Sequence, residues 1–218
     1  MKGLLIKDLK LIKKQNRILA ITALLCVWFF ITDRDASAIS AYIAAMISII
    51  AVGTVNYDEF DNGMGFLFTF PISRRSYVLE KYVFGILLMA VVCIAGSALV
   101  FAQAMLKHKP FDAATGFTAL LVPVITMSLI LSVSLPIQLK YGAENSRAVL
   151  LLVGVCAAVI IYGAQQMAKV FAIDFSGVKE RIVQASITEV AVCICVLSVA
   201  MLGISYWISV MIMKGKQF

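Results

Sequence analysis

The stretch YVFGILLMAVVCIAGSALVFAQAML, residues 82–106, decides the fold. It runs for 25 residues without a charged side chain. The hydrocarbon core of a bilayer is about 30 Å thick and takes roughly 20 apolar residues of helix. The chain as a whole is 62% hydrophobic with a mean hydropathy of +0.98, which lies outside the range of a soluble domain of 218 residues. The sequence therefore predicts a membrane protein.

Similar apolar runs occur on both sides of this stretch. They are continuous rather than alternating, which is typical of transmembrane helices and not of membrane-spanning strands. We expect one all-α, polytopic domain over residues 1–218, with its charged residues in the connections. The six predicted spans are 18–31, 38–55, 82–106, 117–137, 148–167 and 185–213.

The distribution of basic residues predicts the orientation. Six spans place the two termini, the 56–81 loop and the 138–147 loop on one side of the membrane. That side holds 13 of the 19 Lys and Arg residues, and the opposite side holds six. Because cytoplasmic segments carry the excess of Lys and Arg, we expect both termini and the 56–81 loop in the cytoplasm.

Residues 1–17 are basic and amphipathic. At 100° per residue, the leucines and Ile12 fall on one half of a helix and the basic side chains on the other. This pattern predicts a helix at the membrane surface. Two roles remain open: anchorage to anionic lipid, worth about 1 kcal/mol per basic residue, and contact with a protein. Asp8 lies in the apolar half, which favours the second role.

The loop YDEFDNGMGFLFTFPISRRSYVLEK, residues 57–81, separates the second and third spans. Asn62-Gly63 is a natural helix terminator because both residues tolerate the left-handed conformation. Ser73 can cap a new helix, and Pro71 stops the segment before it. We therefore expect a second helix from Arg74 through the rest of the loop into the third span.

An aromatic and apolar cluster lies between these two helices. Aromatic side chains are stable at the headgroup region, so the cluster could fold back onto the membrane. Aromatic and Arg residues are also enriched at protein interfaces, so it could instead insert into a cytoplasmic subunit. The cluster and its basic rim are Phe66, Leu67, Phe68, Phe70, Pro71, Arg74 and Arg75.

The order of these features resembles the permease subunits of ABC-2 type ATP-binding cassette exporters. In that family an acidic residue precedes a segment similar to FTFPISRRSYVLEKY, residues 68–82, although leucine usually stands where this chain has Phe70. The resemblance implies that the 56–81 loop is a coupling helix seated in an ATPase. The resemblance and the aromatic cluster together, with Asp8 added from the N-terminal helix, give the residues that we expect at this interface: Glu59, Phe66, Phe68, Phe70, Pro71, Ser73, Arg74 and Arg75.

The resemblance also implies partners. It predicts two copies of an ATPase, which would bind ATP and Mg²⁺, and a second permease, identical or paralogous. The small size is similar to permeases that export phenol-soluble modulins or bacteriocin-like peptides in Gram-positive bacteria. We therefore expect an amphipathic peptide or other amphiphile as substrate, contact with membrane lipid, a bacterial plasma membrane and no nucleic-acid partner.

Catalytic chemistry is not expected in this chain. No GxxxxGK[ST] phosphate-binding loop occurs, His108 is the only histidine, and no cysteine pair has metal-binding spacing. We expect no catalytic residue, no metal site and no cofactor of its own. A secondary transporter and a non-transporting partner, such as an immunity protein, remain as alternatives.

Glu189 is the one acidic residue within a predicted span. Ionisable residues inside a membrane usually have a function, so Glu189 could line a substrate path. It also lies near the outer end of the sixth span, where it could reach the headgroup region.

Overall fold

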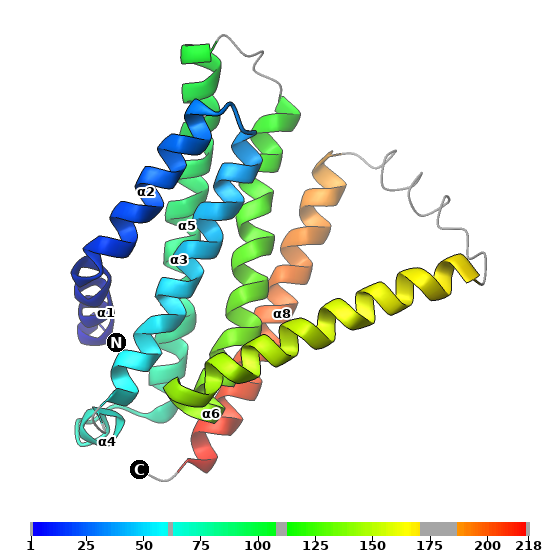
Figure 1. Ribbon diagram of the computed structural model, residues 1–218. Coiled ribbons are helices and arrows are strands. Elements are labelled where there is room, and N and C mark those ends of the chain that lie inside the picture. Colours follow the sequence, from blue (N-terminus) through cyan, green and yellow to red (C-terminus); the bar gives the residue numbers. More distant parts are fainter. Residues whose placement is uncertain (1, 61–62, 108–112, 171–186, 217–218) are drawn as a thin grey trace.

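The computed structural model describes residues 2–60, 63–107, 113–170 and 187–216 (Figure 1). Every regular element in these ranges is an α-helix, so the predicted all-α class is confirmed. The helices are α1 (Lys2–Lys14), α2 (Asn16–Ile31), α3 (Ala36–Glu59), α4 (Gly63–Leu67), α5 (Arg74–Lys107), α6 (Ala113–Val170) and α8 (Ile187–Gly215).

Four helical segments of the described chain are long and apolar enough to cross a membrane. The structure is thus that of a multi-pass membrane protein, and the count rises to five if α1 and α2 form one bent span. The four segments are Ala36–Glu59, Arg74–Leu106, Gly116–Gly142 and Thr188–Gly215.

The predicted count of six is not reproduced by this criterion. The predicted first span falls in α2, whose 16 residues extend over only about 24 Å, less than a hydrocarbon core. The predicted fifth span, 148–167, belongs to the last part of α6, which leaves the bundle at an angle (Figure 1, yellow).

The best-packed part of the bundle lies at the end that holds the α4 loop and the C-terminus (Figure 1). Helix α3 supplies Val55 there, α5 supplies Tyr77, α6 supplies Leu135 and Leu139, and α8 supplies Met213, and each of these side chains is almost fully buried. Elsewhere the helices bury less. Half of the most apolar 18-residue stretch of α3 is buried, whereas only 11% of the corresponding stretch of α8 is buried. The core thus concentrates where the loop meets the bundle.

Hydroxyl groups join α5, α6 and α8 inside the bundle. The Tyr82 hydroxyl lies 2.6 Å from that of Ser205 and 2.9 Å from that of Ser209. Ser205 also donates a hydrogen bond to the Ser132 carbonyl oxygen at 2.6 Å. Such interhelical hydrogen bonds stabilise helix packing where no water is available.

Helix α6 is two helices joined at Gly142. This residue has φ 76° and ψ 178°, a conformation that only glycine adopts readily. The sequence predicts a loop over 138–147, whereas the structure reverses the chain at this single residue. The kink lies at the same end of the bundle as α4 and the C-terminus (Figure 1).

Candidate functional site

The α4 loop begins against the end of α3. A Cβ atom at Gly63 would lie 2.8 Å from the carbonyl oxygen of Asp58. Glycine is therefore required for this close approach, and the short helix α4 starts directly beneath α3. Of the predicted Asn62-Gly63 terminator, Asn62 lies outside the described residues.

The aromatic cluster of the loop is divided between two environments. Phe66 is 70% exposed and Phe70 is 52% exposed, and their rings meet edge to face with centroids 5.4 Å apart. Phe68 instead turns toward the bundle and lies 5.9 Å from the ring of Tyr77. The exposed part of the predicted cluster is thus the Phe66/Phe70 pair, with Pro71 also exposed.

The helix after the loop begins as the sequence predicts. The backbone N–H of Ser76 donates to the Ser73 hydroxyl oxygen at 3.1 Å, which caps the first turn of α5. The helix then continues from Arg74 without interruption to Lys107. The loop therefore passes directly into a span.

Two of the predicted interface residues bind the C-terminal segment of this chain. The Arg74 guanidinium donates to the carbonyl oxygens of Met213, at 3.1 Å, and Lys214, at 2.9 Å, in the last turn of α8. This contact satisfies carbonyl groups that a helix end leaves unpaired. The Glu59 carboxylate accepts a hydrogen bond from Lys216 at 3.0 Å. Arg75 is exposed.

Four charged side chains from three helices form a network in which all but the half-buried Lys7 are buried. Lys81 of α5 lies 2.5 Å from a carboxylate oxygen of Asp8 in α1 and 2.8 Å from one of Asp58 in α3. Lys7 of α1 also pairs with Asp58, and it lies 3.2 Å from Asp8. The Tyr77 hydroxyl donates to Asp58 at 2.9 Å. The two positive and two negative charges balance.

The position of Asp8 explains its place in the apolar half of α1. Its side chain is 0% exposed and faces α5, so the protein contact that it makes is within this chain. We therefore leave Asp8 out of the proposed partner surface. Its link with Lys81 spans 73 residues of sequence, and no local spacing indicates it.

Glu80 is buried at the edge of this network and makes no hydrogen bond within it. The residue is 1% exposed, and neither carboxylate oxygen has a hydrogen-bond partner. The Lys81 ammonium lies 4.0 Å from one of them, a long ion pair. Glu80 thus differs from Asp8, which lies equally deep but accepts a hydrogen bond from Lys81 at 2.5 Å.

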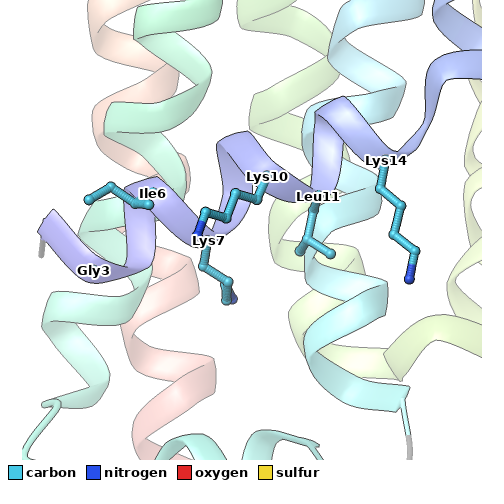
Figure 2. A pocket seen from close by; sticks show the side chains of 6 residues that line it. All are labelled: Gly3, Ile6, Lys7, Lys10, Leu11 and Lys14. Carbon is cyan, nitrogen blue, oxygen red and sulfur yellow. The ribbon is translucent and has the colours of Figure 1, made fainter.

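Helix α1 carries a shallow pocket (Figure 2). The side chains of Lys7, Leu11 and Lys14 point to the same side of the helix in this view. Lys10 and Lys14 are exposed, so this side of α1 presents positive charge. The residues lining the pocket are Gly3, Ile6, Lys7, Lys10, Leu11 and Lys14.

Glu189 lies far from these groups in the fold. It is exposed and belongs to the first turn of α8, the end of that helix opposite the C-terminus (Figure 1). A carboxylate is stabilised there by the positive end of the helix dipole. The geometry therefore gives Glu189 a local electrostatic role without placing it beside the loop.

The comparison with protein families decides the class of this protein. The sequence model of the ABC-2 family of transporter proteins matches residues 3–214, nearly the whole chain. This chain belongs to the ABC-2 transporter family. Comparisons with curated proteins and with solved structures gave no match.

Membership of the ABC-2 family fits the geometry. An ABC-2 chain of this kind is a membrane permease, and the family implies an ATPase partner and a pair of permease chains. The exposed apolar side chains of α2 and α8, such as Leu24, Trp28, Val199 and Trp207, are what a helix facing lipid or a second chain presents.

Proposed function

We propose that this chain is the permease subunit of an ATP-binding cassette exporter and that the loop between α3 and α5 docks on a separate ATPase. The exposed Phe66/Phe70 pair carries the proposal. Two large aromatic side chains lie edge to face on a short turn at the end of the bundle, with the exposed Arg75 following. Soluble surfaces rarely leave such groups uncovered, and Phe and Arg are enriched at interface centres.

The rest of the chain supports a division of labour. No phosphate-binding loop sequence occurs in its 218 residues, so ATP and Mg²⁺ would bind in the partner. The best-packed region lies directly behind the loop. A force applied at the loop would therefore reach α3, α5, α6 and α8 through contacts that are already close.

We also propose the six-span arrangement with both termini in the cytoplasm of a bacterial cell. The fold brings the α4 loop, the Gly142 kink and the C-terminus to one end of the bundle (Figure 1). The connections predicted on that side hold 13 of the 19 basic residues. In this arrangement α2 and the last part of α6 supply the two further spans.

The proposed substrate is an amphipathic peptide or other amphiphile, moved outward. Its support is the resemblance of this small permease to peptide exporters, together with the apolar surfaces of α8 and of the last part of α6. Glu189, exposed in the first turn of α8, is the residue proposed to meet the substrate at the far end of the path.

The test uses the permease in vesicles together with the ATPase that copurifies with it. Phe66→Ala combined with Phe70→Ala should weaken ATPase binding by at least about 2 kcal/mol, or roughly 30-fold. Transport of a labelled amphipathic peptide should fall with it. Phe101→Ala, a change of an equally exposed residue near the other end of α5, is the matched control. Equal ATPase affinity in the double variant and the wild type would contradict the proposal.

A further inference from the structure

The buried charge network joins both sides of the coupling loop to α1. Asp58 is the penultimate residue of α3, and Lys81 lies two turns into α5, so their contact at 2.8 Å ties the chain before the loop to the chain after it. Helix α1 adds one partner to each: Lys7 pairs with Asp58, and Asp8 pairs with Lys81. Three segments far apart in sequence thus meet at one point.

We propose that Lys7, Asp8, Asp58 and Lys81 form a latch that makes α1 and the coupling loop move as one body. The inference rests on the proposed function, because the movement would be driven by an ATPase docked on the loop. The four side chains act as positioning residues: they touch no substrate, and they determine where α1 lies when the loop moves.

The packing of α1 shows why its attachment depends on these charges. Among its described side chains, only Leu4 and Asp8 are buried, while Ile6 and Leu9 are more than half exposed. The apolar contact is therefore small. Without the ion pairs, little would hold α1 against α3 and α5.

Ion pairs also define the register of α1 more sharply than apolar contacts would. Each ammonium group lies within 3.2 Å of two carboxylates, and Lys81 donates in addition to the Thr54 hydroxyl at 3.0 Å. A shift of α1 by one helical turn, about 5.4 Å, would separate both pairs that join α1 to its neighbours, Lys7–Asp58 and Asp8–Lys81. Buried charges left unpaired are costly, so the latch resists such a shift.

The chain offers variants that separate the latch from plain stability. Asp8→Asn combined with Lys81→Met removes one charge of each sign and leaves the Lys7–Asp58 pair balanced, so the fold is retained while the links of Lys81 to α1 and α3 are lost. Glu80→Gln is the matched control. It removes a buried negative charge next to Lys81, but one without a hydrogen-bond partner and on α5 itself.

The experiment uses the permease in vesicles with its ATPase, in a background where the five native cysteines are replaced by alanine. A spin label at Lys13→Cys, an exposed position of α1, reports the mobility of α1. ATP hydrolysis and peptide transport are measured on the same samples. The double variant should free the label and lower transport per ATP hydrolysed by at least about fivefold, the low end of typical coupling energies. Glu80→Gln should match the parent in both.

Each outcome has a defined meaning. If the double variant leaves the label immobile, or frees it without changing transport per ATP, the latch is refuted while the docking proposal stands. If the parent protein binds no ATPase at all, the proposed function fails, and the latch fails with it. The ATPase should still bind the Asp8→Asn/Lys81→Met variant, whereas it should be lost from the Phe66→Ala/Phe70→Ala variant. That result would show that the latch transmits movement and does not dock the partner.

Discussion

Lys81→Met should be among the most destabilising single substitutions in this protein. The Lys81 ammonium contacts Asp8 at 2.5 Å, Asp58 at 2.8 Å and the Thr54 hydroxyl at 3.0 Å, and its side chain is 1% exposed. Methionine keeps the length of the side chain and removes the charge. Two buried carboxylates would then share the single ammonium of Lys7.

The magnitude follows from the burial of the pair. Removing one partner of a buried ion pair costs about 3–5 kcal/mol, because the remaining charge loses its compensation. For a chain of this size, that corresponds to a decrease in Tm of about 10 °C. Adding Asp8→Asn should restore part of the loss, since charge balance returns. The two substitutions should therefore be less than additive.

Thermal unfolding of the purified permease in detergent, followed by tryptophan fluorescence, measures both effects. Trp28 in α2 and Trp207 in α8 report from two sides of the bundle. In a chain of this size, 1 kcal/mol of stability corresponds to about 2–4 °C in Tm. A Tm for Lys81→Met within about 2 °C of the wild type would therefore refute the reasoning. So would a double variant whose loss equals the sum of the two single losses.

Two further substitutions test the loop and the kink. Gly142→Ala should destabilise the protein by about 1–2 kcal/mol, because φ is 76° and the new Cβ would lie 3.2 Å from a carboxylate oxygen of Glu59. The control, Gly154→Ala, lies in a helix with open space around it and should be neutral or stabilising by up to about 1 kcal/mol. Equal Tm values for the two variants would contradict this account. Phe68→Ala should lower the free energy of unfolding by about 2 kcal/mol, since this half-buried ring packs on the core. Phe66→Ala removes an exposed ring and should change it by no more than about 0.5 kcal/mol. Denaturation of both variants measures the difference, and a larger loss for Phe66→Ala would contradict the packing described for the loop.

Local chemistry explains which elements the sequence could predict. The start of α5 depends on one side chain, Ser73, and on Pro71 before it, so both the helix and its cap are readable from residues next to each other. Long uncharged runs likewise predict spans, because only their length and composition matter. Four of the six predicted runs meet that criterion in the structure.

Contacts between distant segments could not be read in the same way. Asp8 and Lys81 are 73 residues apart, and either could have been a solvated charge. The sequence indicates only that Asp8 is out of place in an apolar stripe. Similarly, Phe66 and Phe68 look alike in a loop of aromatic residues, and packing against Tyr77 decides which one turns inward.

The kink in α6 shows a third limit. Residues 138–147 contain charged residues and Gly142, a pattern typical of a loop between two spans. The helix instead continues to Tyr141 and the chain reverses at Gly142, whose φ is positive. The Glu59 carboxylate lies beside Gly142, so a side chain from another helix limits what can stand at this position.

Site-specific photocrosslinking from position 66 in intact membranes tests the central claim most directly. A photoreactive phenylalanine analogue at Phe66 should crosslink to a phosphate-loop ATPase, and the same analogue at Phe101, which is similarly exposed on α5, should not. Crosslinks from position 66 to lipid alone, or labelling of this position by a reagent confined to the cell exterior, would contradict the account.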